Sequence, residues 1–190
     1  MCGHSGLYIC DNRQGNKIDF VKGGLKKMTD KIKGNIMNKI SNINNIPREY
    51  MDDPDFQTKM KTVLIGDAIG CEKIYVNIDY VKPGGKSVKY HSHSKQEEFF
   101  LIMNGNGILR LNGAEIQIKT GDVISKLAGK NIAHQFINNG SDILQILDVG
   151  TREKGDIAKY PDENIVYARD EKLVFNINDN IKNWTSDPNT

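Results

Sequence analysis

The sequence predicts a mainly β protein, built as a sandwich or barrel of short strands. Between residues 55 and 150, short apolar or alternating segments recur, and Gly or Asn turns separate them. No helical pattern of apolar residues interrupts this region, which excludes a parallel sheet made of alternating strands and helices. A chain of 190 residues accommodates one such domain with appended segments.

The composition narrows the class of partner and the compartment. The formal net charge is only +2, so neither nucleic acid nor an anionic membrane is an expected partner. An apolar run of about 18 residues, the length needed for a membrane helix, is missing, and the N-terminus does not resemble a secretory signal. The cysteines, Cys2, Cys10 and Cys71, form no CxxC pair, which favours a reducing cytoplasm.

Residues 1–41 form an N-terminal extension in which an amphipathic helix is expected. Apolar residues recur in steps of three or four from Leu25 to Ile43, although Gly34 weakens the pattern. Three roles stay open: a helix packed on the barrel or on a second subunit, an extension outside the recognisable fold, and a basic helix that binds membranes or partners. A second helix at helix-turn-helix spacing is missing, so a DNA-binding domain is not expected.

The strands can be assigned in order from their apolar patterns and from the turns between them. Asn112 and Gly113 separate two alternating segments and predict a type I′ hairpin, because both central residues of that turn need positive φ. The apolar residues expected on its inner face are Leu109, Leu111, Ile116 and Ile118. The predicted strands cover residues 57–65, 72–81, 99–103, 108–111, 114–118, 123–124, 135–137 and 143–149.

The stretch from Pro83 to Gly105 carries the residues with the most distinctive chemistry. His91 and His93 are two positions apart, so on a strand both side chains point to one face. Imidazole and carboxylate are ligands for divalent transition metals, and both rings can offer lone pairs near neutral pH. Glu97 and Glu98 follow, but adjacent strand residues face opposite ways, so only one of them can face an ion.

Strand parity also indicates a turn after the histidines. Glu98 lies five positions after His93, which would place it on the opposite face of a continuous strand. We therefore expect a turn at residues 94–96 and a neighbouring buried strand beyond it. The alternative is a surface hairpin with two incidental histidines.

The same stretch resembles the first signature of the cupin superfamily, G-x5-HxH-x4-E-x6-G. The residues that fill it are Gly85, His91, His93, Glu98 and Gly105. The spacing to Gly105 selects Glu98 over Glu97 as the family's ligand. The second cupin signature is filled less regularly, by Gly121, Gly129, His134 and Asn138. Leu127 replaces its proline, and four residues instead of two separate Gly129 from His134.

This resemblance implies a single cupin jelly-roll (double-stranded β-helix) barrel over residues 42–170, with a tail at 171–190. It also implies a divalent transition metal ion (Fe, Mn, Ni or Zn) as the cofactor. The implied ligands are His91, His93, Glu98 and His134. Such a set leaves two positions open on a six-coordinate ion, as in catalytic sites. No catalytic residue is assigned, and no organic cofactor is expected.

The resemblance leaves the activity open among several classes. The first hypothesis is an oxygenase, decarboxylase or isomerase that acts on a small organic molecule. The second is a non-catalytic module that binds a small molecule or a metal. The third is a protein that binds a partner through the N-terminal helix. The interior near the ion is expected to be largely apolar. No Lys or Arg is expected to point into it, which disfavours a phosphosugar isomerase. A homodimer is expected, with residues 55–66 as a candidate contact.

Overall fold

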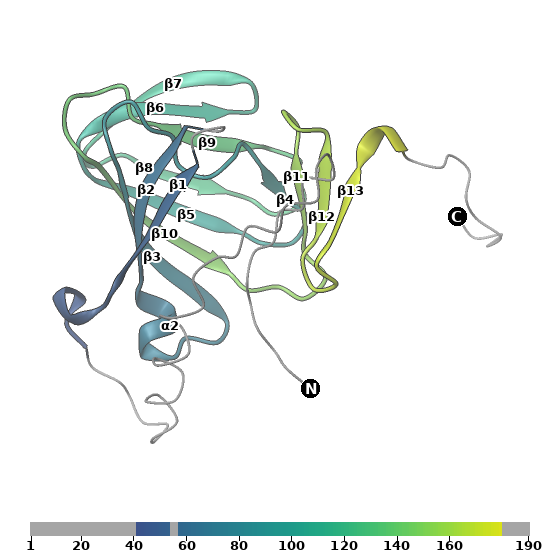
Figure 1. Ribbon diagram of the computed structural model, residues 1–190, viewed down its shortest axis with the longest axis horizontal. Coiled ribbons are helices and arrows are strands. Elements are labelled where there is room, and N and C mark those ends of the chain that lie inside the picture. Colours follow the sequence, from purple (N-terminus) through teal and green to yellow (C-terminus); the bar gives the residue numbers. More distant parts are fainter. Residues whose placement is uncertain (1–40, 54–56, 180–190) are drawn as a thin grey trace, which may run out of the picture. The chain divides into compact units, whose positions relative to one another are not determined.

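The computed structural model describes residues 41–53 and 57–179, all within the compact unit Asn38–Thr190. This part of the chain is mainly β, as the sequence predicts, with three short helices: η1 (Ile43–Asn45), α2 (Ile65–Ile69) and η2 (Ile177–Asp179) (Figure 1). The helix predicted from Leu25 onward falls on residues 1–40, outside the described part. Within the described residues, no helix has the length and apolarity to cross a bilayer.

The strands follow the predicted order with small changes at their ends. The predicted segments correspond to β2 (Thr58–Leu64), β3 (Ile74–Val81), β5 (Glu98–Asn104), β6 (Asn106–Leu111), β7 (Ala114–Lys119), β8 (Val123–Lys126), β9 (His134–Ile137) and β10 (Leu144–Thr151). The strand expected to carry the histidine pair is present as β4 (Ser92–His93), with His91 just before it. The additional strands are β1 (Arg48–Asp53), β11 (Ile157–Tyr160), β12 (Ile165–Ala168) and β13 (Leu173–Asn176). The last of these lies within the segment predicted to be a tail.

Two sheets share one apolar core. A six-stranded sheet has the order β1-β2-β3-β10-β5-β8, and a three-stranded sheet has the order β7-β6-β9 (Figure 1). Side chains from both sheets meet in the core, and they are Met60, Val81, Phe100, Ile102, Leu109, Ile118, Phe136, Leu144 and Ile146. Burying these side chains contributes about 1.5–3 kcal/mol each. The core therefore joins the two sheets and leaves one end of the interior for polar residues.

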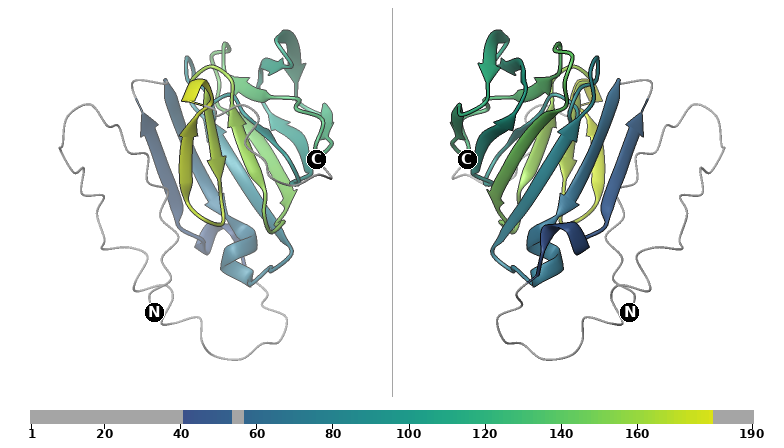
Figure 2. Two further views of the ribbon diagram at one scale, coloured as in Figure 1. Left: turned by 90° about the vertical axis from the view of Figure 1, so that its right-hand side faces the viewer. Right: turned by 90° about the vertical axis from the view of Figure 1, so that its left-hand side faces the viewer.

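A third sheet, with the order β13-β12-β11-β4, connects the C-terminal hairpins to the segment that carries the histidines (Figure 2). Its β11 pairs with β4, so that Ala158 lies opposite His93 and Lys159 opposite Ser92. These contacts are long-range in sequence, and no apolar periodicity signals them. They bring residues beyond 150 next to the predicted site.

Two turns depend on glycine residues with positive φ. Asn112 and Gly113 have φ of 48° and 83°, which confirms the predicted hairpin turn between β6 and β7. Gly105 has φ of 84°, and a Cβ there would lie 2.7 Å from the carbonyl oxygen of Ile143. Ile116 corrects one prediction: it pairs with Leu109, but it is 45% exposed. The strand at residues 99–103 corrects another: it was expected to be fully buried, but Phe99 and Met103 are 43% and 41% exposed, because β5 buries only the face that carries Glu98, Phe100 and Ile102.

Candidate metal centre

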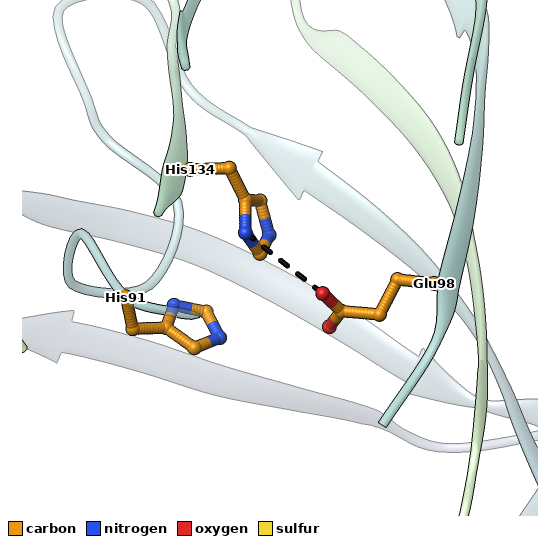
Figure 3. A group of neighbouring side chains, drawn as sticks. All are labelled: His91, Glu98 and His134. Carbon is orange, nitrogen blue, oxygen red and sulfur yellow. Dashed lines mark ion pairs between the residues drawn. The ribbon is translucent and has the colours of Figure 1, made fainter. Parts of the chain in front are cut away.

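His91, Glu98 and His134 come together from three separate segments (Figure 3). His91 precedes β4 and forms a backbone bridge with His134, the first residue of β9. The two hydrogen bonds of this bridge measure 3.2 and 2.9 Å. Glu98 is the first residue of β5, beyond a bend at residues 94–95, which confirms the predicted turn. Glu98 is buried and Glu97 is exposed, as strand parity predicts.

The three side chains have the spacing that a metal ion needs. Their ligand atoms all lie within 4.8 Å of one another, and His134 Nδ1 is 3.8 Å from Glu98 Oε2. Metal–ligand bonds of about 2.0–2.2 Å place neighbouring ligand atoms about 3.0–4.3 Å apart. All three residues are buried. The geometry therefore fits a small divalent ion without a large rearrangement.

Two of these ligand atoms are buried without a hydrogen-bond partner. They are Glu98 Oε2 and His134 Nδ1. Leaving a buried polar atom unpaired costs about 1–3 kcal/mol, more when the group is charged. Lys126 balances the charge of Glu98 without forming a hydrogen bond to Oε2. A metal ion would bind both atoms at once, which is the clearest sign in the structure that the residues suit one.

His93, the fourth predicted ligand, lies beside this group. Its Nδ1 is 2.6 Å from Asp156 Oδ2, and its Nε2 is 3.6 Å from Glu98 Oε1. The side-chain amide of Gln96 lies between, with Nε2 at 3.2 Å from His93 Nε2 and 2.9 Å from Glu98 Oε1. His93 Nε2 is thus close enough to Glu98 for both side chains to bind one ion. In this structure, however, it contacts the side-chain amide of Gln96.

Backbone and side-chain acceptors fix the tautomers of the HxH pair. His91 Nδ1 lies 2.8 Å from the carbonyl oxygen of Lys89, and His93 Nδ1 faces the Asp156 carboxylate. Because neither partner can donate, each Nδ1 carries the proton. Each Nε2 is then left as a lone pair, the form in which imidazole binds a metal.

The electrostatics of the group favour the ligating forms. Burial lowers the pKa of His91 to about 4, and the neighbouring His93 adds to this. Burial also lowers the pKa of His134, with a further contribution from His91. Burial alone would raise the pKa of Glu98, but the surrounding imidazoles and Lys126 lower it to about 2. At neutral pH the imidazoles of His91 and His134 are neutral and the Glu98 carboxylate is ionised, as metal binding requires.

Lys126 is a site residue that the sequence reasoning missed. It ends β8, directly opposite Glu98, and its Nζ lies 2.7 Å from Glu98 Oε2. This corrects the prediction that no Lys or Arg points into the interior. The predicted strand ended at Ile124, whereas β8 continues for two more residues and keeps the same inward parity.

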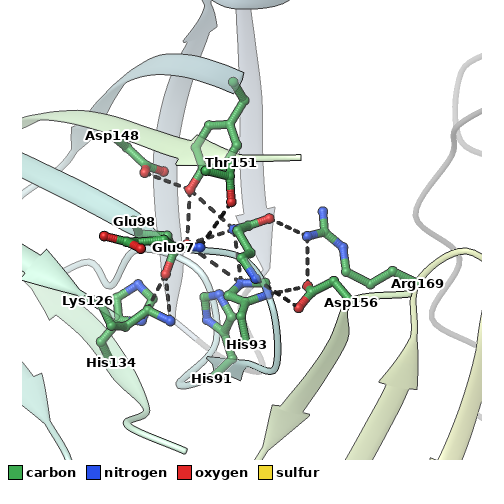
Figure 4. Close-up of polar contacts among 12 residues, drawn as sticks. His91, His93, Glu97, Glu98, Lys126, His134, Asp148, Thr151, Asp156 and Arg169 are labelled. Carbon is green, nitrogen blue, oxygen red and sulfur yellow. Dashed lines mark hydrogen bonds and ion pairs between the residues drawn. The ribbon is translucent and has the colours of Figure 1, made fainter. Parts of the chain in front are cut away.

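Polar groups also line the side of Glu98 that faces β3 and β10 (Figure 4). Asp148 lies on this side of Glu98. The hydroxyl oxygen of Tyr75 is 3.0 Å from Glu98 Oε1 and 2.9 Å from Asp148 Oδ1, and its single proton can be donated to only one of them. Burial and the nearby Asp79 raise the pKa of Asp148. The expected apolar interior is present only on the other side, where the Phe100 ring lies 5.1 Å from that of His134.

A second layer of contacts comes from beyond residue 150. Asp156 is buried and accepts from His93 and from the backbone N–H groups of Lys95 and Gln96, at 2.9 and 3.2 Å. Arg169 donates to Gln96 Oε1 at 2.5 Å and to Asp156 Oδ2 at 3.3 Å (Figure 4). No short motif marks these two residues, since their role depends on the pairing of β4 with β11.

Comparison with known proteins relates this chain to the cupin domain. The family profile for the cupin domain matches residues 78–150. An oxalate-binding protein from Thermotoga maritima is 36% identical over 67 residues, which are 35% of this chain and 54% of that protein. The chain therefore spans about half the length of the curated relative it matches.

Solved structures extend the likeness to most of the described part. A sugar phosphate isomerase from a cupin superfamily, from Silicibacter pomeroyi, superposes with a TM-score of 0.66 at 25% identity, covering 74% of this chain and 94% of that one. A predicted oxalate decarboxylase from Thermotoga maritima superposes with a TM-score of 0.52 at 22% identity, covering 60% and 100%.

Proposed function

This chain is a member of the cupin superfamily, and on that premise we propose that it binds one divalent transition metal ion and uses it to act on a small organic molecule. The proposed ligands are His91, His93, Glu98 and His134. The observation that carries the proposal is a pair of buried atoms that form no hydrogen bond, Glu98 Oε2 and His134 Nδ1, at 3.8 Å from each other. The proposed ion is Fe, Mn, Ni or Zn, since imidazole and carboxylate ligands suit all four.

The chain's own residues would divide the work at this centre. Such an ion supplies a Lewis acid, an activated water or a redox centre. Asp156 would hold the His93 ring and its tautomer, because it accepts the Nδ1 proton at 2.6 Å. Tyr75 would orient Glu98, because its hydroxyl lies 3.0 Å from Oε1. Release of His93 Nε2 to the ion requires the Gln96 amide to move aside.

Metal content of the purified protein tests the proposal directly. We expect close to one ion per chain by elemental analysis, and no stoichiometric metal in His91→Ala or Glu98→Ala. The matched control is Glu97→Ala, since Glu97 is exposed and on the opposite strand face. Metal that survives Glu98→Ala but disappears in Glu97→Ala would show that the ligand assignment is wrong.

The reaction class is the finer part of the proposal. Oxygenase, decarboxylase and isomerase chemistry all use a metal with open positions, and the solved structures named above include a predicted oxalate decarboxylase and a sugar phosphate isomerase. A non-catalytic binding module is the alternative, which the name of the oxalate-binding relative supports. Three assays distinguish the reaction classes: oxygen uptake, carbon dioxide release and sugar isomerisation. Each is measured after anaerobic loading of the protein with Fe(II) and with Mn(II). Ligand binding without turnover in all three assays would support the binding module.

We also propose a closed jelly-roll barrel, a homodimer and a cytoplasmic location. The dimer is supported by exposed apolar residues on the outer face of β5 and β8, where Phe99 is 43%, Met103 41% and Val123 64% exposed. Large exposed apolar patches mark interaction sites. Light scattering after size exclusion should give twice the chain mass for the wild type and a monomer for Val123→Glu. A monomeric wild type would overturn the dimer.

A further inference from the structure

Lys126 is held in a setting that is unusual for a lysine. Among residues whose side chains the structure describes, it is the only Lys or Arg that is buried, at 2% exposure. A buried ammonium is stable only when it is paired. Its partner is Glu98, whose Oε2 lies 2.7 Å from Nζ, and both side chains are almost fully enclosed. The contact lacks the direction of a hydrogen bond, since Glu98 Oε2 has no hydrogen-bond partner.

We propose that Lys126 is the residue that selects the charge of the ligand at this centre. While the metal is absent, its ammonium balances the Glu98 carboxylate. When the metal takes over that role, the ammonium is free to favour a small dianion, such as a molecule with two carboxylates or one phosphate. This inference rests on the proposed function, because it needs the metal to bind at Glu98.

The charge count explains the preference for a dianion. A divalent ion, one carboxylate and one ammonium give a formal charge of roughly +2 when the imidazoles are neutral. A net charge is costly in a buried site, where the effective dielectric constant is low. A ligand with two negative charges cancels it, whereas a monoanion leaves about half of it. Without Lys126, a monoanion would already suffice.

The position of Lys126 also makes it a competitor of the metal. Lys126 Nζ and His134 Nδ1 both face Glu98 Oε2, at 2.7 and 3.8 Å. The other carboxylate oxygen, Oε1, is taken up by Tyr75 and Gln96 at 3.0 and 2.9 Å. An incoming cation therefore meets the ammonium at the same oxygen. Removing the ammonium should strengthen metal binding and weaken anion binding, and a residue with only a packing role would not produce these opposite effects.

The test measures both affinities in Lys126→Met, with Lys126→Arg and the exposed-lysine variant Lys119→Met as controls. Cobalt(II) affinity is obtained by competition with a chromophoric chelator. Oxalate and glycolate, a dianion and a monoanion, are then titrated calorimetrically into cobalt-loaded protein. Circular dichroism checks that each variant is folded, and Lys126→Gln, which can still donate to Glu98, replaces the Met variant if that one fails to fold.

We expect Lys126→Met to bind cobalt about 10- to 100-fold more tightly, because a charged competitor at one oxygen is removed. Cobalt-loaded Lys126→Met should bind oxalate at least about tenfold more weakly, the loss expected for one charge-assisted hydrogen bond, with little change for glycolate. Lys126→Arg should keep the preference for oxalate, and Lys119→Met should match the wild type. Oxalate affinity of Lys126→Met within about twofold of the wild type would overturn the inference.

The wild type alone also decides the question if no Lys126 variant folds. Oxalate should bind the cobalt-loaded protein more tightly than the metal-free protein, because the metal adds positive charge at the site. By reciprocity, oxalate should strengthen cobalt binding by the same factor. It should also bind more tightly than glycolate by at least about tenfold. Equal affinities for the two anions would overturn the role of Lys126 and leave the metal centre intact. A wild type that binds no cobalt, iron, manganese, nickel or zinc would instead refute the proposed function itself.

Discussion

Asp79 should make the protein less stable as the pH rises, and Asp79→Asn should remove this effect. Asp79 lies on β3 and is buried, and its Oδ1 accepts a 2.7 Å hydrogen bond from Thr62 Oγ1. Burial raises its pKa from 3.8 to about 6, against the lowering effect of the Thr62 hydroxyl. The folded protein therefore binds a proton that the unfolded chain has already released between these two values.

The sign and size follow from linkage between protonation and folding. A folded pKa above the unfolded one means that the stability contributed by Asp79 is fully present below pH 3.8 and is lost as the pH rises to about 6. At 1.36 kcal/mol for each pH unit, the loss is about 3 kcal/mol at pH 8. Asparagine has no charge to bury and still offers an oxygen to Thr62, but its amide needs a new acceptor, which costs about 1–2 kcal/mol. The net gain for Asp79→Asn at pH 8 is about 1–2 kcal/mol.

Urea unfolding at pH 4.5, 6 and 8 checks this expectation. A chelator is present throughout, so that metal binding does not contribute. The difference between Asp79→Asn and the wild type should grow with pH in favour of the variant. The exposed control, Asp142→Asn, should stay within about 0.5 kcal/mol of the wild type at each pH. A variant that is destabilised equally at pH 4.5 and pH 8 would show that Asp79 is ionised in the fold without penalty.

Asp156→Asn should lower metal affinity about 10- to 100-fold in chelator competition, because it removes the charge that orients His93. Asp162→Asn, in an ion pair with Arg110 that is partly exposed, should leave metal affinity unchanged, and equal effects of the two would contradict a positioning role. Gly105→Ala should destabilise by about 3 kcal/mol or more in thermal unfolding, because φ is 84° and a Cβ would meet backbone at 2.7 Å. The control Gly121→Ala has the strain of a 93° φ without the clash, so it should lower the stability by about 1–2 kcal/mol. If Gly105→Ala lowered the stability by no more than this, the steric argument would be refuted.

The part of the fold that the sequence predicts is the part held by local patterns. Apolar patterns and Asn-Gly turns located β2, β3 and β5 to β10, because each of these strands contributes apolar side chains to the shared core. In contrast, β13 is exposed on both faces, so no burial pattern distinguishes it from a loop. Likewise β11 and β12 have only four residues each, and β4 is defined by a partner more than 60 residues away.

The candidate site divides in the same way. Strand parity predicted that only one of Glu97 and Glu98 faces the interior, and the structure confirms this. The choice of Glu98 and the inclusion of His134 came instead from the cupin resemblance, and the structure brings both residues together with His91. The direction of the His93 ring depends instead on Asp156, which lies 63 positions further along the chain. A single sequence carries no local signal for such a contact, so His93 was assigned to the ion without its acceptor.

The inward position of Lys126 could have been predicted from strand parity. Its position, two residues beyond Ile124, has inward parity in any strand that continues past the predicted end. Strand ends are the least certain part of a sequence assignment, and here the error of two residues concealed the one buried cation next to Glu98 among the side chains that the structure describes. The consequence reaches beyond the fold. Since a lysine was not expected inside, a phosphosugar isomerase was disfavoured on the sequence alone. An ammonium next to Glu98 instead favours anionic ligands over neutral ones once a metal shares that carboxylate.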